Sequence, residues 1–340
     1  MKLSSCRIGI FLLLSFWACK KEIAPPYDLG CLLPYLSPSF PTDDPNFNCC
    51  DCGVDVQEVY SSVIPFDYLY PIVNPNNRNQ MVYYRRDNTQ SLFNGYQIWF
   101  LDFCTQERLL LANNALYGIE WGSNDWIFYT ATNQNINKIK SNGDSLTQVT
   151  FTHGGYNRYP KFSPSGNKFM YQSEVNGITN LLIQEINTYE IDTIKTTPAI
   201  LSWSWIDESS IFYFIWESND VIGLRLFDLN SRQEMYIHNF LLGGSIKLLI
   251  DNAQYIKKDN SILWCAYKTV GKTNIDSGTT EILLNAFDQE VFLGLSLIGA
   301  EGDFVLNKRI IHMIDSCHID SEYNFYLISQ DGKRYDKIKL

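Results

Sequence analysis

Short apolar segments alternate with polar turns through the whole chain after about residue 66. One unit recurs six times: an apolar or aromatic residue ends a strand, a polar turn follows, and a strongly apolar strand begins. The apolar strands are expected to start at Val82, Ile127, Phe169, Ile211, Ile262 and Ile310. A period of this length with several short strands per repeat is typical of a β-propeller. We therefore expect an all-β fold, a six-bladed β-propeller with four-stranded antiparallel blades, over residues 58–340.

The clearest copy of the unit spans residues 156–195. Its pattern predicts an inner strand at 158–162, a second strand from Phe169, a third strand at 180–185 and an outer strand at 191–194. In the other copies, the third strand is expected at 97–102, 136–139, 224–228, 281–284 and 325–328. In the first and last copies the polar turn is expected between residues 73 and 82 and between residues 304 and 310.

The same copy carries a motif that resembles a known family. Tyr159-Pro-Lys-Phe-Ser-Pro-Ser-Gly166, followed by an apolar strand, is similar to the WD40-like repeat of the TolB-like six-bladed propellers. Ser165 stands where that family usually has Asp, and the copies near residues 200, 256 and 304 keep only the spacing. The resemblance implies a six-bladed propeller exported across the inner membrane, with a role in binding other proteins at the envelope.

The N-terminus reads as a secretory signal over residues 1–18. Lys2 and Arg7 supply positive charge, and residues 8–18 form an apolar stretch too short to cross a bilayer. Ala18-Cys19 resembles a bacterial lipoprotein signal, although bulky Trp17 departs from it. That resemblance implies that Cys19 is acylated and that the chain is lipid-anchored in the cell envelope, at the outer membrane. The alternatives are an ordinary cleaved signal and a retained anchor.

Residues 19–57 are expected to form a Pro/Cys-rich tether. Nine of the chain's twelve prolines lie between Pro25 and Pro75, and proline-rich sequence without periodicity behaves as an extended spacer. The cluster Cys49-Cys50-Asp51-Cys52 is read as disulfide-forming in an exported chain, because zinc sites pair cysteines at wider spacings. Residues 54–64 either add a strand to the last blade or lie across one face.

The composition of the chain limits the classes of partner that it is expected to bind. The hydrophobic content of 45% suffices for a full core, and the formal net charge is −10. Because the chain has no Lys/Arg-rich run, nucleic acid and anionic lipid headgroups are not expected partners.

A binding site is expected in the loop that leads into the clearest copy. His153, Tyr156, Arg158 and Tyr159 combine hydrogen-bond donors with aromatic rings next to a flexible glycine pair. Loops that gather at one face of a propeller usually carry its functional residues. The alternative is an exposed polar loop shaped only by its glycines.

No catalytic residue, metal site or cofactor is predicted. The four histidines lack the i, i+4 spacing of a helical zinc motif, and no G-x-S-x-G segment occurs. The turn carboxylates Asp67, Asp125, Asp207, Asp259 and Asp303 could supply a glycosidase pair, but aspartate is expected in β-turns for backbone reasons alone.

Three functions follow from these patterns. The preferred one is a non-enzymatic, lipid-anchored module that binds another envelope protein or a surface polymer. The second is a glycan- or lactone-processing hydrolase with its site at the mouth of the central channel. The third is a structural accessory whose cysteine-rich tether docks within a larger membrane complex.

Overall fold

The computed structural model describes residues 36–38, 66–87, 95–151, 155–196, 200–218, 221–241, 250–287, 289–298, 302–313 and 319–338. Within these ranges the chain is almost entirely β-strand, with one short 3₁₀ turn, η3 (Lys257–Asp259). No helix in these ranges has the length and apolar character needed to span a membrane. The all-β prediction is confirmed.

The strands form five antiparallel sheets. The largest contains β2 (Phe66–Asn74), β3 (Asn77–Asp87), β4 (Tyr96–Asp102), β5 (Arg108–Trp121), β6 (Trp126–Ala131), β7 (Ile136–Lys140) and β8 (Thr147–Gln148). The next two contain β9 (Gly155–Phe162), β10 (Lys168–Val175), β11 (Ile178–Glu185) and β12 (Ile191–Thr196), then β13 (Ile200–Asp207), β14 (Ser210–Ser218), β15 (Val221–Asp228) and β16 (Glu234–Leu241). The last two contain β17 (Ile250–Ile256), β18 (Ser261–Ala266), β19 (Thr269–Asn274) and β20 (Thr280–Asn285), then β21 (Glu290–Ile298), β22 (Asp303–Met313), β23 (Ile319–Ile328), β24 (Tyr335–Ile338) and β1 (Leu36–Pro38).

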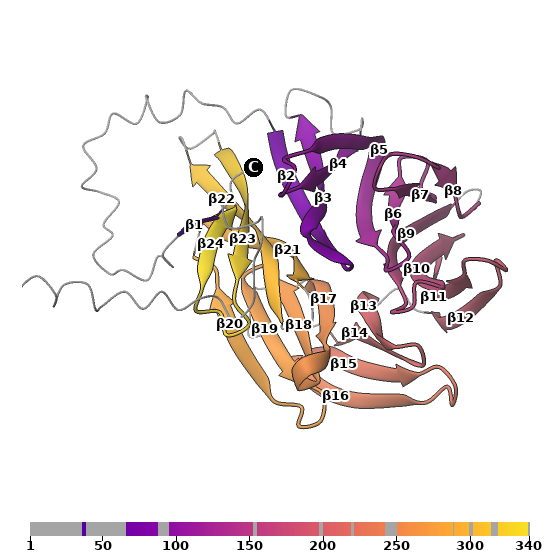
Figure 1. Cartoon of the computed structure of the whole chain (residues 1–340). Helices are drawn as coiled ribbons and strands as arrows, with labels where there is room; N and C mark the ends of the chain where they lie inside the picture. Colours follow the sequence, from indigo (N-terminus) through magenta and orange to yellow (C-terminus); the bar gives the residue numbers. More distant parts are fainter. Residues whose placement is uncertain are drawn as a thin grey trace, which may run out of the picture.

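The long strand β5 makes the seven-stranded sheet a double unit. Its first half pairs with β4, up to Ala115, and its second half pairs with β6, from Ala115 to Trp121. With β5 shared in this way, the strands divide into six units of four strands each, to the last of which β1 is added as a fifth strand. We number these units 1 to 6 in chain order. The units follow one another around a ring in Figure 1, so that the last sheet lies beside the first.

The core consists of the layers between neighbouring units. In β14, Ile211 and Tyr213 pack towards unit 3, whereas Phe212 and Phe214 pack towards unit 5. Successive side chains of a strand point to opposite faces, and both faces of this sheet are covered. An uninterrupted apolar run is therefore what a central strand of a propeller blade requires.

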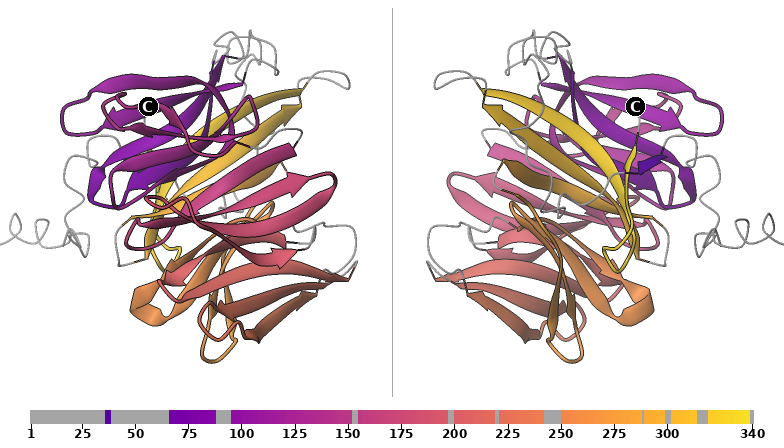
Figure 2. Two further views of the ribbon diagram at one scale, coloured as in Figure 1. Left: turned by 90° about the vertical axis from the view of Figure 1, so that its right-hand side faces the viewer. Right: turned by 90° about the vertical axis from the view of Figure 1, so that its left-hand side faces the viewer.

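Units 1 and 6 close the ring through side chains and one added strand. The main-chain N–H of Val73 donates to Ser296 Oγ at 3.0 Å, and Phe103 of unit 1 packs in one apolar cluster with Ile338 of β24. The strand β1 pairs antiparallel with β24, with Leu36 opposite Ile338, at the outer edge of unit 6 (Figure 2). The added strand thus comes from residues 36–38, inside the predicted tether. Residues 54–64 and the boundary at residue 57 lie outside the described residues.

The predicted third strand of unit 5 is wrong. Residues 281–284 lie in β20, the outer strand, and the third strand is β19, whose sequence Thr-Val-Gly-Lys-Thr-Asn has little apolar character. Gly271 in β19 lies under the ring of Trp264, where a Cβ would come within 2.3 Å of the ring. A neighbouring indole therefore supplies the apolar surface that β19 itself lacks, and the sequence pattern could not show this.

Two of the predicted turns are also misplaced. In the first copy the turn is short and β3 already begins at Asn77. In the last copy, residues 304–310 are not a turn but part of β22, paired on both sides. Asn307 and Lys308, which suggested a turn, are buried in this strand. Their polar groups are satisfied, because Asn307 Nδ2 donates to the Asn324 carbonyl and Lys308 Nζ donates to Glu290.

Candidate functional site

Arg158 lies at the centre of a polar and aromatic cluster at the start of unit 3. Its Nε donates to Gln172 Oε1 at 2.7 Å, and its Nη2 lies 3.7 Å from Glu174 Oε2. The Tyr156 hydroxyl donates to Glu174 Oε1 at 2.9 Å. The guanidinium carbon lies 5.0 Å from the ring centroid of Tyr156 and 5.7 Å from that of Tyr159. We call these five residues the Arg158 cluster.

A β-bulge in β9 positions Tyr159. Met170 pairs with Lys161 and Gln172 with Arg158, so Tyr159 and Pro160 together oppose a single residue of β10. Tyr159 has a φ of 57°, a left-handed conformation that is uncommon for a large side chain. The same Tyr-Pro bulge occurs at Tyr70 in β2, with a φ of 50°.

Neighbouring units fix Tyr159 in place. A Cβ on Gly118 of unit 2 would come within 2.6 Å of the Tyr159 Cα, so only glycine permits this approach. On the other side, the Tyr159 ring meets the Trp203 ring of unit 4 edge to face, with centroids 6.1 Å apart. The tyrosine is nevertheless 39% exposed. It is therefore a rigid aromatic side chain presented to solvent.

The structure brings together three of the four residues predicted for binding. Tyr156, Arg158 and Tyr159 lie in one cluster, whereas His153 lies outside the described residues, as does the predicted lipidation site Cys19. The sequence analysis missed Gln172 and Glu174, which belong to the next strand. Their only sequence signal was the alternation of β10, which places Gln172 and Glu174 on the same face of the sheet.

The cluster offers hydrogen bonds and aromatic surface rather than net charge. One guanidinium faces one carboxylate, and Glu174 also accepts a hydrogen bond from the Thr179 hydroxyl at 3.4 Å. Both charged side chains are about a quarter exposed, at 26% for Arg158 and 24% for Glu174. The arrangement suits a ligand surface that is itself polar and close to neutral.

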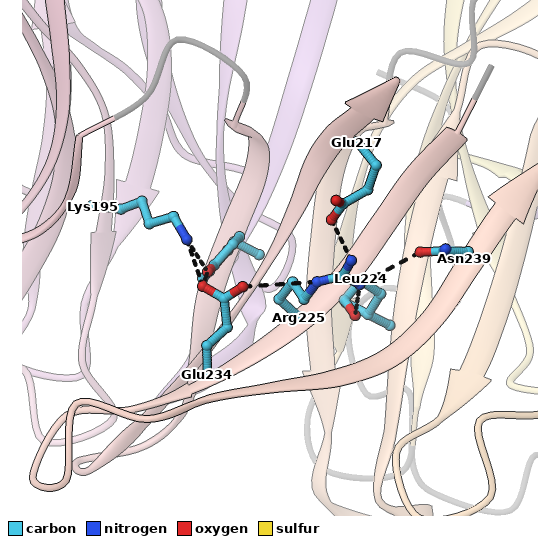
Figure 3. Close-up of polar contacts among 7 residues, drawn as sticks. Lys195, Glu217, Leu224, Arg225, Glu234 and Asn239 are labelled. Atoms are coloured by element: carbon cyan, nitrogen blue, oxygen red, sulfur yellow. Dashed lines mark hydrogen bonds and ion pairs between the residues drawn. The ribbon is translucent and has the colours of Figure 1, made fainter. Parts of the chain in front are cut away.

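A larger ionic network joins units 3 and 4 (Figure 3). Glu234 of β16 accepts hydrogen bonds from Lys195 of β12 and from the Tyr213 hydroxyl, while Arg225 lies between Glu234 and Glu217. Burial acts to raise the pKa of Glu234, but the hydrogen bonds from Lys195 and Tyr213 outweigh it and lower that pKa. Burial and the Glu234 carboxylate raise the pKa of Tyr213 well above its usual value. Lys195 and Arg225 balance the charges of Glu217 and Glu234, so this network stabilises the contact between the sheets of units 3 and 4.

Two of the predicted turn carboxylates share a partner. Gln330 donates through its main-chain N–H to Asp303 Oδ1 at 3.0 Å and through Nε2 to Asp259 Oδ2 at 3.1 Å. Burial raises the pKa of Asp303. Asp303 is only 5% exposed, and Asp259 is also paired with Lys272 at 3.1 Å. These contacts within the fold account for both carboxylates without a glycosidase pair.

Metal ligands and cysteines add little to this site. Among the described residues, no group of three or more His, Cys, Asp or Glu side chains could hold a metal ion. Cys104, in the turn after β4, is disulfide-bonded. Cys265 is buried in β18. The predicted pairing of Cys49, Cys50 and Cys52 falls outside the described residues.

Comparison with known proteins shows the fold. No family model and no curated protein matches the sequence. TolB from Acinetobacter baumannii is 12% identical with a TM-score of 0.56, over 80% of this chain and 63% of that one. Oligogalacturonate lyase from Vibrio parahaemolyticus is 12% identical with a TM-score of 0.53, over 80% of this chain and 77% of that one.

A chain of the nidogen–laminin complex is equally similar. It is 7% identical, with a TM-score of 0.55, over 81% of this chain and 94% of that one. The chain thus spans less than two thirds of the length of the Acinetobacter TolB, and propellers with different functions resemble it equally well. Identities this low carry no activity across. What they do show is that the chain has a β-propeller fold, similar to that of TolB.

Proposed function

We propose that this chain is a lipid-anchored β-propeller of the bacterial cell envelope, at the outer membrane, and a non-enzymatic binding module. Its partner is another envelope protein or a surface polymer, bound through the Arg158 cluster. The observation that carries this proposal is the convergence of Tyr156, Arg158 and Tyr159 on one partly exposed spot. Tyrosine and arginine, with tryptophan, dominate the residues that contribute most to protein interfaces.

The rigidity of the cluster supports a binding role. Tyr159 is held between Gly118 and Trp203, and Arg158 is held by Gln172 and Glu174. Side chains that are already ordered lose little conformational entropy on binding, a loss that otherwise costs about 0.5–1.5 kcal/mol per side chain. A partner therefore gains most of the contact energy that these residues provide.

The added strand β1 would set the point at which an N-terminal anchor meets the ring. If Cys19 is acylated, residues 20–35 separate the lipid from β1, and this length extends to roughly 55 Å at most. Because β1 pairs with β24, the anchor would pull on the outer edge of unit 6.

The alternative function, a glycan or lactone hydrolase, has less support. Of the described residues in the Arg158 cluster, Glu174 alone is a carboxylate, and it is already paired with Arg158 and Tyr156. A glycosidase of the usual type needs two carboxylates on either side of the bond to be cleaved.

Site-specific photo-crosslinking in cells tests the binding role. A photoreactive phenylalanine replaces Tyr159 in one variant and Tyr236, which is 56% exposed on the outer strand β16, in the control. We expect one defined adduct from position 159, absent at position 236, that Arg158→Ala abolishes. Equal adducts at both positions, or none at position 159, would contradict the proposal.

Two further measurements test the remaining parts. Metabolic labelling with a palmitate analogue should mark the wild-type chain and not Cys19→Ser, and an unlabelled wild-type chain would remove the anchor from the proposal. Turnover of aryl glycosides or lactones that is lost in Glu174→Gln would instead establish the hydrolase.

A further inference from the structure

We propose that a pocket between units 2 and 3 binds one sugar ring of a neutral glycan. The pocket has a volume of about 540 Å³ and is lined by Val149, Thr150, Phe151, Tyr171, Gln184, Tyr189 and Ile191. This volume lies within the usual range for small-ligand sites. The proposal does not rest on the Arg158 cluster. Tyr171 and Gln172 are adjacent in β10, so their side chains point to opposite faces of the sheet.

The rim of the pocket consists of exposed apolar side chains. Phe151 is 70% exposed, Tyr189 is 59% exposed and Ile191 is 56% exposed. Phe151 follows unit 2, whereas Tyr189 and Ile191 belong to the turn and strand at the outer edge of unit 3. The C–H faces of a sugar ring pack well against aromatic rings, and these rings are open to such a ligand.

The floor of the pocket is polar and incompletely satisfied. The Tyr171 hydroxyl donates to Gln184 Oε1 at 3.3 Å, and both side chains are almost completely buried, at 2% and 3% exposure. Among the described residues, the Gln184 Nε2 donates to no other group. Burial raises the pKa of Tyr171 to about 12, so its hydroxyl remains protonated at neutral pH. The floor therefore offers one amide donor and one phenolic acceptor side by side.

This combination favours a hydroxyl-bearing ligand. A sugar hydroxyl both accepts and donates a hydrogen bond, so it can satisfy Gln184 Nε2 and the Tyr171 oxygen together. An aliphatic peptide side chain would leave the Gln184 amide donor without a partner, which opposes binding. None of the described lining side chains is charged, so none of them compensates for burying a charged sugar.

The backbone conformation at Tyr189 allows a substitution that tests binding separately from stability. Tyr189 has a φ of 62°, a conformation that glycine adopts far more readily. Tyr189→Gly should therefore keep or raise the thermal stability of the protein. At the same time it removes the aromatic surface that is proposed to bind the sugar, so the variant separates an effect on binding from an effect on the fold.

Saturation-transfer NMR with three neutral hexasaccharides tests the proposal: cellohexaose, maltohexaose and N-acetylchitohexaose. We expect at least one to bind the wild-type chain, and Tyr189→Gly and Gln184→Leu each to weaken it roughly tenfold, the effect of one lost contact. Tyr236→Ala, at a side chain that is 56% exposed on β16 and outside both sites, should leave this binding unchanged.

Other outcomes would overturn it. They are no binding of any of the three hexasaccharides at 10 mM, unchanged affinity in Tyr189→Gly, or preferential binding of hexagalacturonate or of a leucine-rich octapeptide. Since the crosslinking at Tyr159 uses different residues, failure of one proposal leaves the other standing.

Discussion

The buried ion pair of unit 6 permits a quantitative test of how this ring is held together. Lys308 Nζ lies 2.8 Å from Glu290 Oε1, and the two side chains are only 9% and 12% exposed. Lys308 also lies over two aromatic rings, 4.8 Å from the centroid of Tyr326 and 5.2 Å from that of Tyr335. The perturbation is Glu290→Gln, which removes the negative charge and keeps the shape.

The expected cost follows from what remains around Lys308. Removing one partner of a buried pair costs about 3–5 kcal/mol, because the other charge is left without compensation. The two tyrosine rings still attract the ammonium, worth about 2 kcal/mol at a desolvated site, which favours the lower end of that range. Lys268 Nζ donates to the main-chain oxygen of Glu290, so a second positive charge lies nearby and keeps the cost from falling below that range. We therefore expect a loss of about 3 kcal/mol.

Urea and thermal unfolding measure this loss. The midpoint shifts by about 2–4 °C per kcal/mol in chains of 150–250 residues, so in this longer chain it should fall by about 6 °C at most. The control is Glu281→Gln, whose carboxylate is 64% exposed and 3.8 Å from Lys272, and it should cost under about 0.5 kcal/mol. The double variant Glu290→Leu/Lys308→Met should recover most of the loss, since an apolar pair can replace a buried ion pair. Equal effects of Glu290→Gln and the control would refute the reasoning.

Three further predictions concern other parts of the ring. Gly271→Ala should cost about 1–3 kcal/mol, because its Cβ would lie 2.3 Å from the Trp264 ring, and a normal unfolding midpoint would show that the ring moves aside freely. Reducing the disulfide at Cys104, or Cys104→Ser, should lower stability by about 2–4 kcal/mol, and an unchanged midpoint under reducing conditions would contradict this. Because the pKa of Glu234 is lowered in the fold, this residue stabilises the protein above its ordinary pKa of 4.5, and the stabilisation is lost as the pH falls. Because the pKa of Tyr213 is raised, this residue stabilises the protein below its ordinary pKa of 10.0, and the stabilisation is lost as the pH rises. The unfolding midpoint, measured against pH, should therefore fall less steeply towards acid pH in Glu234→Gln and less steeply towards alkaline pH in Tyr213→Phe than in the wild-type chain. Unchanged pH dependence in the two variants would count against the two pKa shifts.

The local pattern of residues determined the repeat and the best-formed unit. The strands expected in residues 156–195 correspond to β9–β12, because apolar residues and turn residues there follow the period of a strand. The continuous apolar run in β14 also predicted a strand covered on both faces, and the packing of Phe212 and Tyr213 in opposite directions confirms it. These features depend on interactions between residues close in sequence.

Contacts between residues far apart in the sequence decided the features that the local pattern did not predict. The strand β19 owes its place to the Trp264 ring over Gly271, and β22 tolerates Lys308 because Glu290, 18 residues earlier, neutralises it. Glu174 joins Arg158 only because a bulge sets the register between β9 and β10. The pocket between units 2 and 3 likewise exists only once Phe151 and Tyr189 are brought together. A sequence states which side chains alternate along a strand, whereas the partner that satisfies a buried charge or fills a space comes from another strand, and only the tertiary structure chooses it.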